Sequence, residues 1–502
     1  MKNIFKVAFL SLLGYGATAQ TLENVNLLNT TGLYGSPRYV GMGGAFMALG
    51  NDLSALHLNP AAGTVYRQDN FGLSLGFQGQ TNSTMFLNGS RSDETIDPVF
   101  QNIGLVKKFG QKDKYFFGLT YNRIADFNTT YNVGGVNPYQ SNGGIETGFT
   151  LGEYWLAAAN GLTVAELESA GFIDEASAAS ADVLLRDQND NDRVIGFDFV
   201  DNESNVDYRY SETGSRSEIA INFGGAVSKT FSWGAGIGIP SLSYTNTGTL
   251  TESGYADTSY FNSVDLVRSN SVDAYGINLK LGFIFRPVQW FRVGASYQSP
   301  SWYNVNEIYT TRVNGYARNG NVFAGNEYIF DDIRYGVSTP SILRAGLATV
   351  IGKHGIISAD MEYTNPSNTT INGKNNNNYE ADEDFYQQST ESTIALKVGG
   401  ELRFGPVYLR AGAQHRASNF VNPEDYQSSI NMYTGGIGYK KGRFGFDVAY
   451  IHSAYSQNYL AHRYLAYQVD NGIGQEDVNI DRAIVQNDIT KGSVVLGFNL
   501  SF

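Results

Sequence analysis

Segments in which apolar and polar residues alternate recur along almost the whole chain. In one example, Phe71, Leu73, Leu75 and Phe77 alternate with small or polar residues, and the last such run ends on Phe502. A period of two is the pattern of a β-strand with one apolar and one polar face. Because these runs fill most of a 502-residue chain, the sequence predicts a large all-β protein.

Composition and charge exclude several classes of protein. The chain has 35 Lys and Arg against 48 Asp and Glu, a net charge of −13, which argues against a nucleic-acid partner. Aromatic residues make up 13% and charged residues only 17%, so the chain does not resemble a disordered protein. It has no Cys, which excludes disulfides, thiolate zinc sites and a cysteine nucleophile.

The first residues have the features of a secretory signal peptide. Lys2 and Lys6 precede an apolar run over residues 7–15, and small residues follow at 17–19. We therefore expect a signal peptide over residues 1–19 with cleavage before Gln20. Beyond Gln20 no uncharged apolar stretch approaches the roughly 20 residues of a membrane helix. The exported chain is then either soluble or a membrane-spanning β-barrel.

The polar face of the alternating segments favours the barrel. It carries charges of both signs opposite a face of Leu, Val, Phe and Tyr, as expected for a polar lumen and a lipid-facing exterior. A solvated face of a soluble sheet would also collect charges and is the alternative. The predicted polar lining of the lumen comprises Lys280, Arg286, Arg344, Asp360, Glu362, Lys397, Glu401, Arg403 and Arg410.

Connection lengths give a second argument for a barrel. Short links at 109–114, 228–231, 286–291, 351–355, 404–406 and 440–443 alternate with long ones at 80–98, 126–216, 250–271, 313–339, 366–391 and 457–490. Outer-membrane barrels have tight periplasmic turns and long external loops. We predict an antiparallel barrel of about 14 strands over residues 68–502, in the cell outer membrane. The terminal Phe502 resembles the signal read by the barrel-assembly machinery.

Residues 20–67 do not alternate, and we expect them to fold inside the lumen as a hatch. They contain the block Gly35-Ser36-Pro37-Arg38-Tyr39-Val40-Gly41-Met42-Gly43-Gly44-Ala45-Phe46, then Asn51-Asp52-Leu53-Ser54-Ala55, then Asn59-Pro60-Ala61. Asp52 is expected to cap a short helix running to about Leu56, which Asn59-Pro60 would end.

These three blocks resemble the N-terminal hatch of the FadL/TodX-type family, outer-membrane channels for long-chain fatty acids and other hydrophobic compounds. The resemblance implies passive transport: ligand is captured at external loops, passes to an apolar pocket against the hatch and leaves sideways into the membrane. It also implies that Asn59, Pro60 and Ala61, with Gly43, Gly44 and Phe46, belong to the gating hatch. The alternative for the Asn59 triplet is a fixed helix stop. No Pro lies near Gly118 in the third strand, so the sequence does not locate the lateral gap.

The long external loop over residues 126–216 departs from this family pattern. Thr163 to Glu166 reads as a capping box, and residues 176–185 are a second candidate helix. The loop could form an apolar capture groove from Trp155, Leu156, Leu162, Leu167 and Phe172. Equally, it could be a lid or a docking surface for another protein. An alternative function is therefore a scaffold or shuttle that binds partner proteins in secretion or surface attachment.

No motif predicts catalysis or a cofactor. The Gly41 to Phe46 run lacks the third glycine of a dinucleotide loop, and the five His show no metal-ligand spacing. Asp187 to Asp198 has a degenerate calcium-loop spacing, and a solvated acidic loop is the simpler interpretation. We expect a transport protein that is not an enzyme and whose partners are a hydrophobic small molecule and outer-membrane lipid. Acidic external loops disfavour attraction of a free anion, so capture should rely on apolar contact or involve a ligand that is not a carboxylate.

Overall fold

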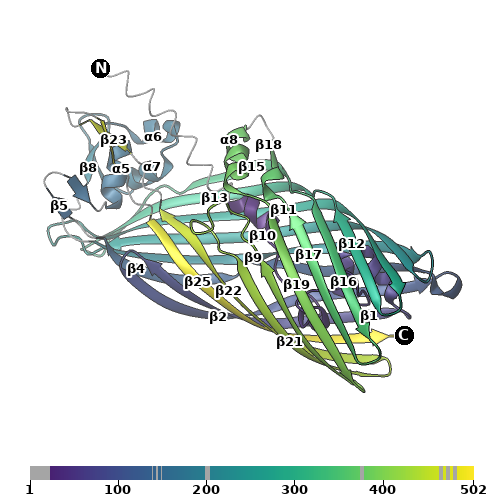
Figure 1. Ribbon diagram of the computed structural model, residues 1–502. Helices are drawn as coiled ribbons and strands as arrows, with labels where there is room; N and C mark the ends of the chain where they lie inside the picture. Colours follow the sequence, from purple (N-terminus) through teal and green to yellow (C-terminus); the bar gives the residue numbers. More distant parts are fainter. Residues whose placement is uncertain are drawn as a thin grey trace.

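The computed structural model describes residues 23–137, 140–142, 145–147, 150–197, 204–373, 378–462, 467–470, 475–478 and 483–502. The predicted signal peptide, residues 1–19, lies outside the described residues. Strands dominate, and they curve around a lumen that holds the N-terminal segment, drawn in purple (Figure 1).

Fourteen antiparallel strands close into a barrel within the described residues, as the alternation predicts. In chain order they are β1 (Asn70–Phe86), β2 (Gly89–Phe109), β3 with β4 (Tyr115–Asp126, Thr129–Asn137), β9 (Ser204–Ala226), β10 (Phe231–Ser253), β11 (Phe261–Val288), β12 with β13 (Phe291–Gln298, Trp302–Ala317), β15 with β16 (Tyr328–Ser338, Ile342–Ile351), β17 with β18 (Gly355–Thr364, Thr370–Gly373), β19 (Thr393–Phe404), β20 (Val407–Arg416), β21 (Ile430–Lys441), β22 (Phe444–His462) and β25 (Ala483–Ser501). Closure is made by β25 and β1, which pair from Asn70↔Ser501 to Met85↔Gln486.

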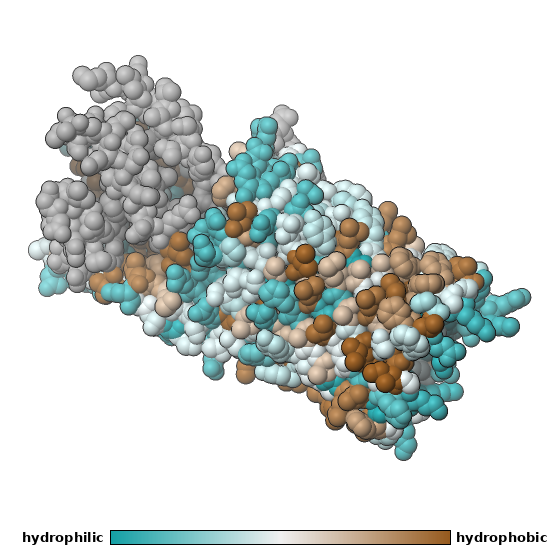
Figure 2. Space-filling view, in the orientation of Figure 1, coloured by the Kyte–Doolittle hydropathy of each residue, from teal (hydrophilic) through white to brown (hydrophobic). Residues whose placement is uncertain are grey.

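The outer face of the barrel is apolar. Outward side chains such as Leu281 (60% exposed), Phe77 (55%) and Leu396 (51%) leave their surface uncovered by protein. Apolar residues, in brown, gather over the strands on the face shown in Figure 2. So much uncovered apolar surface on a folded chain requires a hydrocarbon surrounding, and we describe the protein as a membrane-spanning barrel.

All six short links predicted from the sequence are tight connections at one end of the barrel, which also holds the closure at Asn70 and Ser501. Several predicted long links are instead mostly strand. β1 and β2 continue through 80–98 and meet at Phe86↔Gly89, and β10 and β11 fill most of 250–271. β13 and β15 likewise extend into 313–339. Beyond the membrane both faces of a strand are polar or aromatic, so the alternation that marks a strand is lost there.

The described part of the hatch lies in the lumen. Residues 23–29 are helical, and α3 (Pro37–Val40), α4 (Leu53–Leu58) and the 3-10 helix η1 (Pro60–Val65) follow. Asp52 caps α4 through its carboxylate, which accepts from Ser54 N at 2.9 Å, and Asn59 is the C-cap. The predicted cap and stop are therefore confirmed, with the helix two residues longer than expected.

An external lobe covers part of the long-loop end of the barrel. It contains α5 (Leu151–Ala159), α6 (Val164–Ala170), α7 (Ile173–Ser180), β7 (Leu184–Asp187) and β8 (Arg193–Phe197). The capping box of Thr163 and Glu166 is present and opens α6. The second predicted helix, over residues 176–185, corresponds to α7, which begins at Ile173 and ends at Ser180. The sequence reasoning did not predict α5.

The remaining elements are short. They are β5 (Gln140–Asn142), β6 (Ile145–Thr147), β14 (Val322–Ala324), β23 (Tyr467–Asp470), β24 (Gln475–Val478), α8 (Glu380–Ser389), η2 (Gln111–Asp113) and η3 (Pro366–Asn368). Among the described residues, no helix is both long and apolar enough to cross a membrane.

Candidate functional site: the hatch and the wall around it

A glycine turn of the hatch packs against strands β19 to β21. Gly43 and Gly44 have φ of +61° and +76°, and the Gly43 amide donates to Thr434 Oγ1 at 3.1 Å. Phe46 is fully buried; its ring lies 5.6 Å from that of Tyr39 and 5.2 Å from the Arg38 guanidinium. All three predicted hatch residues of this block therefore lie in the packed interior, in contact with each other or with the wall.

Glycines on many strands let the hatch approach the wall backbone to backbone. A Cβ at Gly294 or Gly399 would lie 2.1 or 2.2 Å from a hatch carbonyl oxygen, that of Met47 or Met42. Hatch backbone crowds Gly234 and Gly412 in the same way, and hatch side chains crowd Gly72, Gly118, Gly282, Gly346 and Gly497. Sequence reasoning missed this set, although the signal was present: these glycines occupy inward positions of the alternation, where a side chain would be expected.

The triplet Asn59-Pro60-Ala61 lies against β10 and β11. Asn59 Nδ2 donates to the Met47 carbonyl at 2.8 Å and to the Phe283 carbonyl, on β11, at 3.2 Å, while its Oδ1 accepts from Ala61 N at 3.0 Å. A Cβ at Gly282 would lie 2.1 Å from Asn59 Oδ1, and one at Gly234 would lie 2.4 Å from the Pro60 carbonyl carbon. The triplet thus fastens one hatch turn to another and to the wall.

Next to the triplet, a buried charge cluster joins α4 to strands β9 and β11. Lys280 contacts the carboxylate of Glu218, whose Oε1 lies 3.0 Å from His57 Nδ1, and Lys280 Nζ donates to the His57 carbonyl at 3.0 Å. Burial and the nearby Lys280 ammonium lower the pKa of His57 to about 4, outweighing the opposite effect of Glu218. His57 is therefore neutral at physiological pH.

Two further clusters hold the hatch on other sides of the lumen. Glu362 accepts from Arg344 at 2.8 Å and from Arg416 at 3.0 Å, with Lys397 at 3.5 Å. The adjacent Asp360 carboxylate accepts from the Met47 amide at 2.8 Å.

In the third cluster, hatch residue Arg38 donates to Glu401 at 2.9 Å. Glu401 also accepts from Arg410 at 2.7 Å, and Arg410 pairs with Asp447 at 2.6 Å. These pairs neutralise most of the buried lumen charge, as a low-dielectric interior requires.

The structure thus places seven of the nine residues of the predicted lumen lining in the buried lumen: Lys280, Arg344, Asp360, Glu362, Lys397, Glu401 and Arg410. Arg286 is half-buried near the tight-turn end. Arg403 is exposed: β19 ends at Phe404, so this inward position lies at the tight-turn end of its strand, where Arg403 packs on the Tyr408 ring. The predicted set did not include Glu218, Arg38 or His57, which complete the clusters in the lumen.

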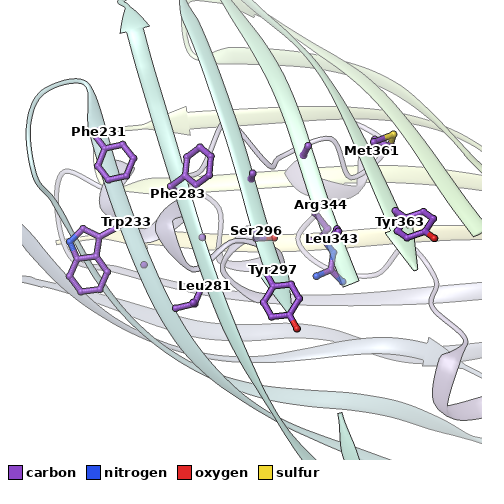
Figure 3. Close-up of a pocket in the computed structure, with 14 residues that line it drawn as sticks. Phe231, Trp233, Leu281, Phe283, Ser296, Tyr297, Leu343, Arg344, Met361 and Tyr363 are labelled. Atoms are coloured by element: carbon purple, nitrogen blue, oxygen red, sulfur yellow. The ribbon is translucent and has the colours of Figure 1, made fainter. Parts of the chain in front are cut away.

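On the membrane face, directly outside the triplet, lies an apolar hollow of about 780 Å³. It is lined by Phe231, Trp233, Gly234, Leu281, Gly282, Phe283, Ala295, Ser296, Tyr297, Leu343, Arg344, Ala345, Met361 and Tyr363. Figure 3 shows the aromatic side chains of Phe231, Trp233, Phe283 and Tyr297 around it. The hollow spans strands β10, β11, β12, β16 and β17.

A smaller cavity of about 120 Å³ lies in the lumen on the long-loop side of the hatch, beside helical residues 23–29. Its wall is rich in aromatic rings, including Phe127, Tyr210, Tyr244, Phe420, Tyr426, Tyr455 and Tyr459. Asp126, Glu212 and Lys491 add charge. The cavity therefore offers ring faces together with polar groups.

The predicted external capture residues do not line an open groove. Trp155 and Leu167 are fully buried, and Leu156, Leu162 and Phe172 pack against the same apolar cluster, which includes rim residues of the barrel. These side chains form the core that attaches the external lobe. The apolar residues of these helices suggested an exposed binding face in the sequence. In the structure, strands at the barrel rim cover that face.

No group of three or more potential metal-ligating side chains occurs among the described residues. Asp198, the last position of the degenerate calcium-loop spacing, lies outside them. Within the described part of this spacing, Asp187 Oδ1 accepts from the Asn189 amide at 2.9 Å, as in an ordinary turn.

No protein-family profile matches the sequence, and no curated protein does. Solved structures are similar in fold. A Pseudomonas aeruginosa FadL homologue matches with a TM-score of 0.54 and 12% identity, over 94% of this chain and 99% of that one. The CymD monoaromatic hydrocarbon channel (TM-score 0.50, 14% identity, 94% and 99%) and the Pseudomonas putida toluene transporter TodX (0.50, 13%, 93% and 98%) are also similar. The chain has the fold of a FadL-type outer-membrane β-barrel, with the predicted strand number.

Proposed function

We propose that this barrel is a passive outer-membrane channel for hydrophobic small molecules, long-chain fatty acids or similar compounds. The proposal rests on two features that occur together: the hatch fills the lumen, and at one part of the wall glycine backbone separates the hatch from the membrane face. The hatch and its ion pairs occupy the lumen, while a hollow of about 780 Å³ on the membrane face is separated from Asn59 and Pro60 by glycine backbone. Leaving water along such a route lowers the free energy of an apolar solute, whereas a polar solute has no such gain.

The proposed path has three stages. The aromatic cavity beside residues 23–29 receives the solute from the long-loop side. Rearrangement of Asn59-Pro60-Ala61 then removes the contacts with Met47 and Phe283 and opens the lumen towards the membrane. Release into the bilayer is downhill, because each methylene transferred from water into hydrocarbon contributes about 0.8 kcal/mol. The proposal requires neither a nucleotide nor another energy source.

Two of the proteins similar in fold support this class of solute: CymD is a monoaromatic hydrocarbon channel and TodX is a toluene transporter. In this proposal the partners of the chain are the solute and outer-membrane lipid. Recognition of Phe502 by the barrel-assembly machinery remains a prediction from the sequence alone.

The alternative is a scaffold that binds partner proteins through the external lobe. It is favoured by two exposed apolar side chains on the small β7–β8 hairpin, Leu185 (43% exposed) and Ile195 (59%). Replacing both with Ser should leave transport unchanged if the lobe only covers the barrel, and should abolish partner binding if the lobe is a docking surface.

Native mass spectrometry of protein extracted gently from outer membrane separates the two functions. A bound apolar small molecule in stoichiometric amount, identified after extraction, would support the channel and give its solute class. A bound protein together with an empty barrel would favour the scaffold. Uptake of radiolabelled palmitate and toluene by cells with and without the protein is the companion measurement, and equal uptake of both probes in both strains would refute the channel.

A further inference from the structure

We propose that the tight-turn end of the barrel holds a binding site for a phosphate group, centred on Arg286 and Arg292. The site is separate from the proposed transport path and does not depend on it. Three observations carry it: an excess of cations at this end, two neighbouring guanidinium groups without a carboxylate partner, and the polar side chains of the adjacent turn.

Positive charge is concentrated at the tight-turn end of an acidic chain. The chain as a whole has 35 Lys and Arg against 48 Asp and Glu. The six tight links, each taken with two residues on either side, contain a single acidic residue, Asp113, but 12 basic ones: Lys107, Lys108, Lys112, Lys114, Lys229, Arg286, Arg292, Lys353, Arg403, Lys440, Lys441 and Arg443. This charge attracts anions to the end of the barrel that faces the periplasm in outer-membrane proteins.

Arg286 and Arg292 lie side by side at this end. Strands β11 and β12 pair at Phe285↔Val293, and the two arginines are the next residues on the turn side of that pair. Both are half-buried and continue the inward alternation of their strands, and Arg292 Nη1 donates to the hatch carbonyl of Leu49 at 3.1 Å. Like charges opposite each other destabilise a strand pair, so strand pairing alone does not favour two arginines here.

The two guanidinium groups lack the carboxylate partner that other inward arginines have. Arg344, for example, pairs with Glu362 at 2.8 Å. Within the described part of the chain, Arg286 and Arg292 make no ion pair, and Arg286 Nε, Arg286 Nη2 and Arg292 Nε are enclosed without a hydrogen-bond acceptor. An enclosed donor without an acceptor costs free energy. Rotation of these flexible side chains towards an anion at the mouth of the barrel would remove that cost.

These donors fit a phosphate group better than a carboxylate. A carboxylate carries one charge, which a single guanidinium neutralises, whereas a phosphate monoester carries about 1.5 to 2 charges at neutral pH and offers three acceptor oxygens. The β9–β10 turn adds the exposed Lys229 and the hydroxyls of Ser228 and Thr230, which lie 2.8 Å apart. The Thr230 carbonyl accepts from the Arg286 amide at 2.7 Å, so this turn lies next to the arginines.

Two sources present such a group at this end of the barrel. One is a free phosphate compound in the periplasm, and the other is the headgroup of a membrane lipid such as phosphatidic acid. Trp290, 59% exposed on the turn between the two arginines, is typical of the aromatic girdle at a membrane interface, which places lipid headgroups at the same level. Both sources share the chemistry that the site recognises.

Removal of the two guanidinium groups tests the site. R286M/R292M removes both charges and keeps unbranched side chains. The matched control K441M/R443M removes two charges from another tight link at the same end, where both side chains are exposed. Folding is checked by heat-modifiable migration on gels. Isothermal titration calorimetry with inorganic phosphate at low ionic strength measures binding of the free ligand, and native mass spectrometry after incubation with phosphatidic acid in detergent measures binding of the lipid.

We expect R286M/R292M to weaken binding of the probe at least about tenfold and K441M/R443M to weaken it less than about threefold. R286K/R292K keeps both charges but loses the planar pairs of N–H groups, so it should weaken binding by an intermediate factor. Binding of inorganic phosphate would identify a free ligand, and retention of phosphatidic acid alone would identify a headgroup; either supports the site.

Three outcomes would overturn the site: no saturable binding of either probe, unchanged affinity of the folded R286M/R292M variant, or equal weakening in this variant and in the control. None of them bears on palmitate uptake, so the channel function is tested separately.

Discussion

Two parts of the barrel wall meet the hatch through different kinds of contact. At β3, Gly118 meets the end of the Leu56 side chain. At β10 and β11, Gly234 meets the Pro60 backbone, and Gly282 meets the Asn59 side-chain oxygen, which accepts from Ala61 N at 3.0 Å. The difference indicates that the triplet is held rigidly against β10 and β11, whereas at β3 a side chain can yield.

Locking the hatch to each wall in turn should give the largest difference. The chain has no Cys, so introduced pairs form without competition. N59C/G282C ties the triplet to β11, and L56C/G118C ties α4 to β3. We expect the first disulfide to lower palmitate uptake at least about tenfold, with recovery on reduction. The second should leave most of the uptake, because residues 58–61 remain free. The reverse pattern would show that transport depends on movement of α4 against β3 and not on movement of the triplet.

Removal of one cation should loosen the hatch more beside the triplet than elsewhere. K280M leaves the buried Glu218 carboxylate with only His57 and Asn278, at a cost of about 3 kcal/mol. K397M should be milder, because Glu362 keeps Arg344 and Arg416. Hydrogen exchange of hatch amides measures the loss, and equal exchange in both variants would contradict this ranking.

A single methyl group should distinguish rigid from compliant contacts. G234A places a Cβ 2.4 Å from the Pro60 carbonyl carbon, so hatch backbone must move, at a cost of about 1–3 kcal/mol. In G118A the Leu56 side chain can rotate away, and we expect little change. Limited proteolysis of the hatch reports the displacement. Comparable protection of the hatch in the two variants would show that both walls yield equally.

The smallest effect is a dependence on pH near the triplet. The pKa of His57 falls from its ordinary value of 6.5 to about 4 in the folded hatch, through burial and the charge of Lys280. The released hatch binds the proton more readily, so the neutral His57 favours the closed hatch above pH 6.5. This contribution, at most about 3 kcal/mol, is lost as pH falls from 6.5 through about 4. Hatch protection against proteolysis should decline in that window, and H57Q should not show this decline.

Much of the architecture was predictable from the sequence because a barrel wall repeats one rule. Outward Leu281 and Leu396 alternate with inward Lys280 and Lys397. The same alternation can be read in each strand separately. The rule fails above the membrane, where β1 and β2 continue without an apolar face, and there the sequence suggested loops.

The site was less predictable because it depends on neighbours that are distant in sequence. The motif indicated Asn59, but only the fold brings it to Gly282 and Phe283, more than 200 residues away. The hollow likewise depends on strand register, because Ala295 and Ala345 pair across β12 and β16 and both line it. Trp155 was predicted to line an exposed capture groove, but it is buried against the rim strands. Nothing in the neighbouring sequence indicates this burial.

The most direct test of the proposed path is a crystal soaked with palmitate that carries bromine at the end of its chain. Bromine scatters anomalously, so the peak locates the ligand and distinguishes it from detergent. We predict a peak in the hollow at Leu281, Tyr297 and Leu343, or between Gly282 and Pro60 with the triplet displaced. A peak against Phe117 and Leu119 on β3, with the hollow empty, would contradict the account.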